Sequence, residues 1–337
     1  MNSSFDIPVV LYLFKRKDTV LKILKVLSKI KPTKLYLLSD GGRDDKEIQC
    51  VNECREIIES AIDWDCEVIK KYHQKNVGVY DNIGLGAKWV LSQEDMAIFL
   101  EDDNLPEETF FQYCKELLLK YKDDSRILWI CGSNYLEETS PSDGSSYFFS
   151  KNMLPCGWAS WGDKFTKYYD GELLLWQSEY LKNRIKDEYV LEDLYEQDSY
   201  NIEYEIEHKQ NKGRFYSWDY QMSFSIRVHN LYGIIPKYNQ IKNIGVDDNS
   251  THGGNSLNNV MVERFCERKT KRLEFPLKHP EVVLLDLPLE KKLAEIILDP
   301  SFNSFKSKLS RKIRHKFKIE KTVSIRDSFV NYFNEKK

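Results

Sequence analysis

The sequence lacks the features that mark secreted and membrane-spanning proteins. Its seven cysteines are odd in number and form no CxxC pair, so we expect no disulfide framework and no zinc site, and a reducing compartment fits better. No apolar run approaches the roughly 20 residues that a membrane helix needs. The start, MNSSFDIP, does not resemble a signal peptide. We therefore expect a cytoplasmic protein, either soluble or peripheral on the inner face of the cell membrane.

Charge of one sign is also missing from the chain as a whole. The 50 basic and 53 acidic residues give a formal net charge of −3, which offers no reason to expect a nucleic-acid partner. The distribution is uneven, because residues 301–337 contain 11 basic and only 3 acidic residues. An acidic body with a basic tail suggests that the tail has a partner of its own.

Glycine-rich signatures are absent, but the core-forming residues are plentiful. The pair Gly84 and Gly86 lacks the third glycine of a dinucleotide-binding fingerprint. The 337 residues contain no internal repeat, and 41% are hydrophobic. The chain is therefore long and apolar enough for one large α/β domain with an appendage.

The first 135 residues alternate between strand-like and helix-like patterns. Apolar runs of strand length are separated by segments with apolar residues at helical spacing, which predicts a mostly parallel sheet with helices on both faces. The expected strands are 8–14, 34–39, 66–69, 96–100 and 127–131, and the expected helices are 20–30, 45–62 and 107–121.

Polar residues directly follow three of these strands. Arg16 follows the first strand, Asp40 the second, and the triplet Glu101, Asp102 and Asp103 the fourth. Ligands of parallel sheets bind outside the carboxyl ends of the strands. We therefore expect these side chains to converge at one edge of the sheet.

The triplet within AIFLEDDN is the central feature. Three adjacent acids after a buried strand repel one another unless a cation gathers them, and carboxylates suit Mg²⁺ or Mn²⁺, which also bind substrate phosphates. The alternative is an acidic turn that caps the helix starting near Glu107. Capping needs one acid and not three, which favours a metal site.

Several segments in order resemble one enzyme family. The strand followed by EDD-x-x-P resembles the metal-binding motif of GT-A glycosyltransferases, in particular the N-acetylglucosaminyltransferase I type and related bacterial family 2-like enzymes. Further similar segments span residues 8 to 254: FKRKDT (14–19), SDGG (39–42), NVG (76–78), CGWASWGDKF (156–165), WDYQ (218–221) and NIGVDDNSTHGG (243–254). The resemblance implies a Rossmann-like GT-A fold, here with a C-terminal helical extension.

The resemblance also implies roles for individual residues. Asp103 would bind Mn²⁺ (or Mg²⁺), with His252 reaching the diphosphate or the metal. The nucleotide-sugar would be bound by residues from several segments: Arg16 and Asp40 at the nucleobase, Asn82 in the base pocket, and Glu101 and Asp102 at the ribose and sugar. The donor is expected to be UDP-linked.

Asp219 in SWDYQ is the candidate general base. Inverting transfer needs one carboxylate to take the acceptor proton, while a metal neutralises the departing diphosphate. The alternative is a helix N-cap, and the resemblance favours the base. Trp158 and Trp161 have two interpretations, a sugar-facing wall or core packing, and Gly157 and Gly162 predict tight backbone turns around them.

The predicted activity is that of a hexosyl- or N-acetylhexosaminyltransferase that acts on a glycan or lipid-linked glycan in bacterial surface polysaccharide synthesis. One alternative is a sugar-nucleotide pyrophosphorylase, although FKRKDT lacks the glycine-rich loop of that class. The other is a non-catalytic glycan-binding relative.

We divide the chain into a nucleotide-sugar half (1–135), an acceptor half (136–254) and a C-terminal extension (255–337). The extension contains a basic amphipathic segment near 302–319, with apolar residues at Phe302, Phe305, Leu309, Ile313 and Phe317. This helix either lies on an anionic membrane surface or docks its apolar stripe on the protein's own body. Segment 255–299 is expected to be irregular.

Overall fold

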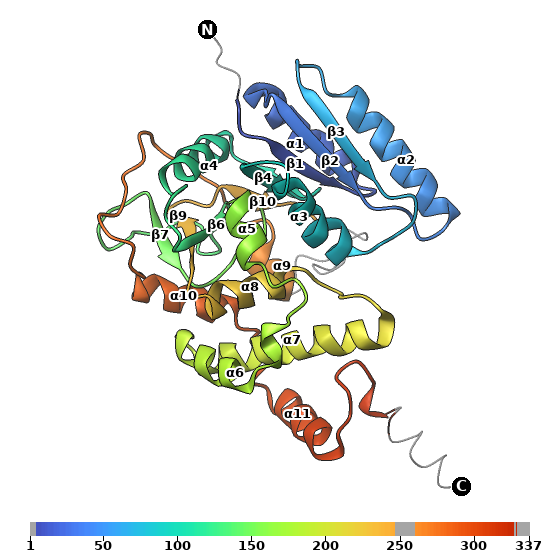
Figure 1. The fold of residues 1–337 in the computed structure, drawn as a ribbon, viewed down its shortest axis with the longest axis vertical. Coiled ribbons are helices and arrows are strands. Elements are labelled where there is room, and N and C mark those ends of the chain that lie inside the picture. Colours follow the sequence, from blue (N-terminus) through green and yellow to red (C-terminus); the bar gives the residue numbers. More distant parts are fainter. Residues whose placement is uncertain (1–4, 247–259, 327, 329–337) are drawn as a thin grey trace.

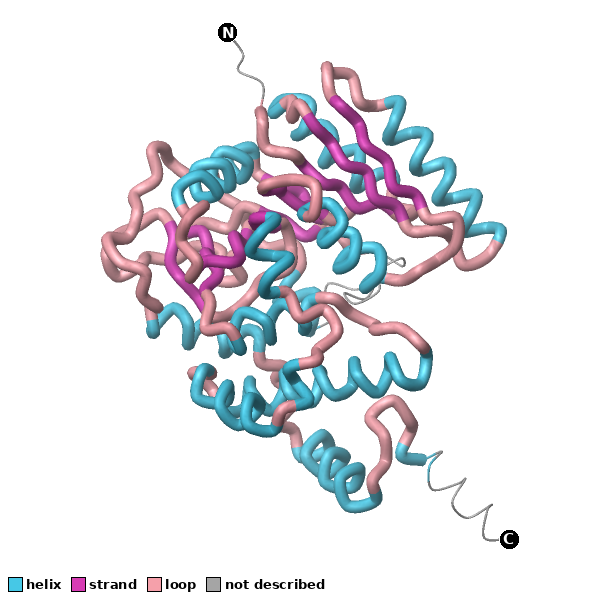
Figure 2. The backbone as a smooth tube through the Cα atoms, viewed as in Figure 1, coloured by secondary structure: helices cyan, strands magenta, loops and turns pink. Residues whose placement is uncertain are grey.

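The computed structural model describes residues 5–246, 260–326 and 328. Its centre is an eight-stranded sheet in the order β3-β2-β1-β4-β8-β6-β9-β7, with helices on both faces (Figures 1 and 2). The predicted α/β fold class is therefore confirmed. The strands are β1 (Val9–Leu13), β2 (Lys34–Ser39), β3 (Glu67–Tyr72), β4 (Met96–Leu100), β6 (Ile127–Cys131), β7 (Tyr147–Ser150), β8 (Trp158–Trp161) and β9 (Tyr232–Pro236).

The two faces of the sheet have separate apolar cores. On one face, Leu11 and Leu37 pack with side chains of α1 (Lys17–Ile30), α2 (Asp45–Ser60) and α4 (Glu108–Lys120). On the other, Val10 and Tyr36 pack with α3 (Leu85–Leu91), α5 (Gly162–Tyr168), α8 (Asp219–Val228) and α10 (Leu287–Ile297). Strands covered on both faces are apolar throughout, which is why apolar runs predicted β1, β2, β4 and β6, whereas the edge strand β3 is partly exposed and has a weaker pattern.

The sheet is parallel at one end and mixed at the other. Strands β3, β2, β1 and β4 pair in parallel, whereas β8 runs antiparallel to both β4 and β6, and β7 runs antiparallel to β9. Strands before and after residue 135 thus share one sheet.

Two local expectations are corrected. Helix α1 begins at Lys17, three residues before the predicted start at residue 20, and Arg16 is its N-cap. Segment 255–299 also contains regular structure, namely α9 (Val260–Phe265) and α10. The Asp286 side chain caps α10 by accepting from the Leu289 amide, and a proline follows in the first turn. These are the usual helix-start signals, so residues 286–289 themselves predict a helix at this point.

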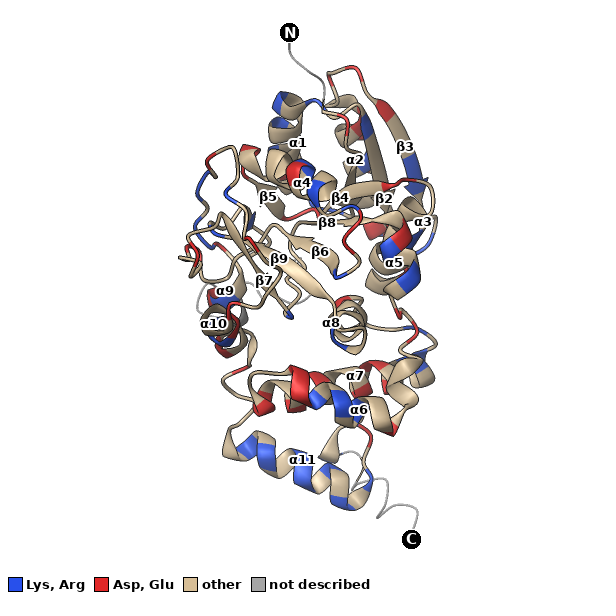
Figure 3. Ribbon diagram, turned by 60° about the vertical axis from the view of Figure 1, so that its left-hand side comes forward, with Lys and Arg blue, Asp and Glu red and all other residues tan. Residues whose placement is uncertain are grey.

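Two smaller groups of elements complete the fold. Strand β10 (Ile241–Asn243) pairs antiparallel with β5 (Asn104–Pro106) beside the main sheet. The helices α6 (Glu179–Ile185), α7 (Glu192–Lys212) and α11 (Phe305–Phe317) gather at the end of the molecule away from β3 (Figures 1 and 3). Two single-turn 3₁₀ segments (Leu175–Gln177 and Lys186–Glu188) flank α6, and a π-helical segment (Tyr80–Gly84) precedes α3.

Candidate functional site

The predicted convergence at the carboxyl edge of the sheet is confirmed for Arg16 and the acidic triplet. Strands β1 and β4 are parallel neighbours, so the residues that follow them lie side by side. The Arg16 guanidinium donates to Asp102 Oδ1 over 3.1 Å and to Asp103 Oδ2 over 3.0 Å. One cation of the chain thus faces two carboxylates of the triplet.

The triplet is electrostatically unfavourable in the protein alone. Burial, followed by the charges of Asp103 and Asp102, raises the pKa of Glu101 well above its ordinary value. Burial also raises the pKa of Asp103, although Arg16 and a hydrogen bond from Asn104 act in the opposite direction. The alternative role as a helix cap is not what the structure has, because the N-cap of α4 is Glu107.

Asn104 positions the triplet and was not singled out from the sequence. Its buried side chain donates to Asp103 Oδ1 over 2.7 Å, while its Oδ1 accepts from the Gly157 amide over 2.7 Å. Gly157 has a φ of +63°, a left-handed conformation that favours glycine, which confirms the predicted turn. The amide therefore ties the loop before β8 to the acidic turn.

The segment after β10 closes against the same turn. The Ile244 amide donates to the Asp103 carbonyl over 2.9 Å. A Cβ on Gly245 would lie 2.2 Å from Asp103 Oδ2, so any larger residue there would have to displace the Asp103 carboxylate. The described residues at the start of this motif, 243–246, thus lie against Asp103.

Asp40 lies at the same edge but is already fully engaged. Its buried carboxylate accepts from the amides of Gly41 (2.7 Å), Val77 (2.8 Å) and Gly78 (3.0 Å) and from Asn76 Nδ2 (2.9 Å). SDGG and NVG, far apart in sequence, are therefore one structural unit. The role of Asp40 at a nucleobase stays a prediction, and it would require one of these contacts to be shared or exchanged.

Arg55 is a second residue that the sequence analysis missed. It is a buried α2 side chain that donates from Nη2 to the carbonyls of Asp40 (3.0 Å) and His73 (2.8 Å). Its only sequence signal was a charge on the apolar side of an expected helix. Its contacts hold the ends of β2 and β3 in place.

Asn82 lies in the π-helical segment after NVG. Its side chain is buried, and its Oδ1 has no hydrogen-bond partner among the described residues. A buried acceptor without a partner costs stability in the absence of a ligand. Its assignment to the base pocket remains a prediction.

Asp219 is the first residue of α8, and its position is close to the triplet. Its charge contributes to the raised pKa of Glu101. The N-cap of the helix is Trp218, so the N-cap interpretation of Asp219 is not what the structure has. The Ser217 hydroxyl donates to Asp219 Oδ1 and orients the carboxylate.

The sugar-wall interpretation of the two tryptophans is corrected. Trp158 and Trp161 are each 1% exposed and belong to the cores on opposite faces of the sheet, because residues three apart on a strand point in opposite directions. Trp158 stacks on Phe99 and Trp129 at centroid distances of 3.8 and 4.0 Å. Both side chains therefore pack the core.

The described residues fit a divalent cation only in one binding mode. Among residues 5–246, 260–326 and 328, no three His, Cys, Asp or Glu side chains form a complete metal site. A cation shared with substrate phosphates needs only one or two protein carboxylates, and Asp103 with Asp102 meets that requirement. His252, the other predicted metal ligand, lies outside the described residues.

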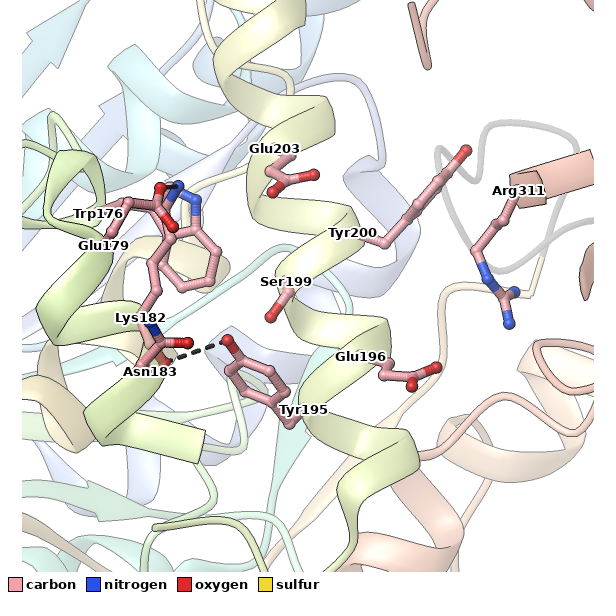
Figure 4. Close-up of a pocket in the computed structure, with 10 residues that line it drawn as sticks. All are labelled: Trp176, Glu179, Lys182, Asn183, Tyr195, Glu196, Ser199, Tyr200, Glu203 and Arg311. Atoms are coloured by element: carbon pink, nitrogen blue, oxygen red, sulfur yellow. Dashed lines mark hydrogen bonds and ion pairs between the residues drawn. The ribbon is translucent and has the colours of Figure 1, made fainter. Parts of the chain in front are cut away.

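A cavity of about 420 Å³ lies away from this edge, between α6, α7 and α11. Figure 4 shows its aromatic and charged lining, with Tyr195 and Tyr200 on α7, Lys182 on one side of that helix and Arg311 on the other, beside Tyr200. Its residues belong to none of the segments that carry the resemblance. The sequence analysis did not predict this cavity.

The chain matches no known protein family and no curated protein by sequence. Among solved structures it is similar to a mannosyltransferase from Pyrobaculum calidifontis in complex with GDP-Man and Mn²⁺, with 11% identity, a TM-score of 0.32 and coverage of 51% of this chain and 46% of that one. It therefore spans less than half of that protein.

Two further solved structures show a comparable likeness. A UDP-glucose pyrophosphorylase complexed with UDP-glucose has 8% identity and a TM-score of 0.35, and the match covers 71% of this chain and 93% of that one. The bifunctional glycosyltransferase WbbM has 8% identity and a TM-score of 0.31, with coverage of 67% and 38%. Likenesses at this level leave the function to be argued from the site.

Proposed function

We propose that this chain is a metal-dependent glycosyltransferase that moves a sugar from a nucleoside diphosphate, UDP in the first instance, to a glycan or lipid-linked glycan hydroxyl with inversion. The observation that carries the proposal is the juxtaposition of Arg16, the acidic triplet and Asp219 at one edge of the sheet. The ordered motifs that resemble the GT-A enzymes support the same activity.

The charge pattern suits a diphosphate and its cation. Asp103, with Asp102 beside it, would hold Mn²⁺ or Mg²⁺, which when bound supplies positive charge for a departing diphosphate. Arg16 already contacts both carboxylates, so it would remain next to the phosphates and add a second cation. The protein's raised Glu101 pKa reflects a site that gains stability when positive charge enters.

Asp219 would act on the acceptor. Its carboxylate takes the proton of the attacking hydroxyl, and the Ser217 hydroxyl holds the carboxylate in orientation. We therefore assign Asp219 as the base and place Glu101 near the sugar, as the resemblance to the GT-A enzymes implies.

A thermal-shift panel of UDP, GDP, CMP and dTDP, with and without Mn²⁺, tests the proposal. A ligand at a hundredfold excess over its Kd stabilises by about 2.7 kcal/mol, so the cognate diphosphate should raise Tm clearly, and only with the metal. The absence of any metal-dependent shift would contradict the proposal. Turnover of sugar-1-phosphate and UTP without transfer would instead support the pyrophosphorylase alternative, and binding without donor turnover would support a non-catalytic relative.

A further inference from the structure

Helix α11 presents apolar side chains to solvent. Phe305 is 81% exposed and Leu309, one turn further, is 45% exposed, and no residue of α11 is buried. From here on, the name apolar stripe is restricted to these two of the five apolar residues that the sequence predicts on one side of the helix. A helix that packs on a globular body normally turns its apolar residues inward, whereas α11 turns Phe305 and Leu309 outward to solvent.

The lysines of α11 surround the stripe. Lys306, Lys308, Lys312 and Lys316 are all exposed, and we call them the basic flank. Lys312 and Lys316 follow Leu309 at spacings of three and seven, which places them on the same side of the helix. Residues 305–317 contain no acidic side chain, as the blue bands on α11 show (Figure 3).

The opposite side of α11 faces the protein. Arg311 Nη1 donates to the Phe302 carbonyl over 2.7 Å, and its guanidinium lies 3.7 Å from the Phe302 ring. Phe302 in turn contacts Tyr200 of α7, with ring centroids 6.4 Å apart. Arg311 also lines the cavity beside Tyr200 (Figure 4).

The loop after α11 fixes this orientation through charge. Lys321 Nζ pairs with Glu203 (2.9 Å) and Glu207 (3.3 Å) of α7, and the Asn211 side chain of α7 donates to Glu320 and Thr322. Of the five apolar residues predicted to form one side of this helix, Phe302 contacts the protein's own body, whereas Phe305 and Leu309 are exposed and do not dock on it. Periodicity defines a stripe, but the acidic surface of α7 decides which side of the helix docks.

We propose that the apolar stripe and basic flank of α11 bind an anionic membrane surface. Exposed lysines complement anionic headgroups, and a phenylalanine and a leucine between them can enter the headgroup–acyl boundary. A second copy of the chain that paired symmetrically through α11 is a poorer partner, because it would bring two basic helices together. No helix within the described residues is long and apolar enough to cross a bilayer, so the proposed contact is peripheral.

The location of α11 determines which end of the molecule would face the membrane. The helix lies at one end of the molecule's longest axis, and the N-terminal strands β1–β3 lie toward the other end (Figure 1). Residues 1–300 carry the acidic excess of the chain, so an anionic surface repels the body and attracts only this end. The inference stands on α11 alone and does not depend on the proposed sugar transfer.

Co-sedimentation of the full chain with vesicles tests the proposal. Vesicles of equal parts phosphatidylglycerol and phosphatidylcholine should bind the protein at low salt, and vesicles of phosphatidylcholine alone should bind it much less. Neutralising the flank as K306Q/K308Q/K312Q/K316Q should weaken partitioning roughly fivefold per lysine, the equivalent of about 1 kcal/mol each. Replacing the stripe as F305S/L309S should weaken it at least tenfold.

Matched controls use exposed residues elsewhere. K22Q/K25Q on α1 and L119S on α4 alter the same residue types at exposed positions and should leave binding unchanged. Failure of the wild-type chain to bind anionic vesicles would overturn the proposal, as would equal binding by F305S/L309S. Dimerisation that this double variant abolishes, without vesicle binding, would assign the stripe to self-association. Because no donor is present, these outcomes are independent of the proposed activity.

Discussion

Two acidic strand ends at the same edge of the sheet are built in opposite ways. After β2, the Asp40 carboxylate accepts four hydrogen bonds from the chain itself. After β4, three carboxylates lie together, and an arginine contacts two of them. Its charge does not offset burial, so the pKa values of Glu101 and Asp103 are still raised. The carboxylate after β2 therefore has its hydrogen bonds supplied by the chain itself. At the triplet after β4, added positive charge would reduce the repulsion between the carboxylates.

This difference gives the two strand ends different expected roles, with Asp40 supporting the fold and the triplet forming the proposed ligand site. Asp40 organises the loop that carries Asn76, Val77 and Gly78, and Arg55 supports the same turn from α2. At the triplet, by contrast, the charge of Asp219 contributes to the raised pKa of Glu101. Substitutions at the two ends should therefore affect different measurements, with stability changing at Asp40 and ligand binding or turnover changing around the triplet.

The largest expected effect is on turnover at Asp219. Asp219→Asn should lower kcat by roughly 10² to 10⁴, the range for loss of a general base, while donor binding is preserved because the amide keeps the shape and an acceptor for Ser217. The control is Asp163→Asn, an exposed acid in the first turn of α5, which should retain activity. Near-normal turnover by Asp219→Asn would remove this residue from the mechanism.

The next effect is on folding at Asp40. Asp40→Ala leaves three backbone amides without their acceptor, and unsatisfied buried donors cost about 1 to 3 kcal/mol each. We expect the free energy of unfolding to fall by about 3 kcal/mol or more in urea titrations. Asp45→Ala, an exposed acid in the first turn of α2, should cost less than about 1 kcal/mol. If both variants lost equally little, the two strand ends would not differ as described.

A smaller effect is expected at Glu101, with a defined pH dependence. The unfolded chain releases this proton near pH 4.3, whereas the folded protein, with its raised pKa, releases it at higher pH. Between these values the folded state binds more protons, so the free energy of unfolding falls as pH rises and levels off above the folded pKa.

Glu101→Gln should remove that part of the pH dependence and stabilise the metal-free protein at neutral pH by about 1 kcal/mol. Thermal melts of the variant and the wild type between pH 4 and 8 measure the difference. If the wild-type protein instead became more stable as pH rises, and the variant changed by the same amount, the Glu101 carboxylate would not be destabilised by its surroundings. The same melts with Mn²⁺ and a nucleotide should reduce the difference between the two proteins.

The sequence was most informative where a short continuous run of residues determines the structure, as in the buried strands. Runs such as MAIFL are buried on both faces, so composition alone located β1, β2, β4 and β6. The residues after those strands then had to meet at one edge, as Arg16 and Asp103 do. Long-range pairing was not encoded locally, so the antiparallel direction of β7 and β8 was not predicted.

Contacts between residues distant in sequence also explain what the sequence analysis missed within the site. Whether Trp158 faces a ligand or the core depends on the neighbours of β8, which are distant in sequence. Three of the four hydrogen bonds to Asp40 come from residues 36 to 38 positions away, so these contacts could not be predicted from the sequence. Asn104 lay within the motif, but its partner Gly157 is 53 positions away.

The most direct test of the account is a calorimetric titration of UDP into the protein with and without Mn²⁺, comparing wild type, Asp103→Ala and Asp95→Ala. Asp95 is an exposed acid just before β4, at the other end of the same strand from Asp103. We predict Mn²⁺-dependent binding for wild type and Asp95→Ala, and its loss in Asp103→Ala, with all three proteins folded. Equal affinity of Asp103→Ala and wild type in the presence of Mn²⁺ would contradict the assignment of the triplet as the metal and diphosphate site.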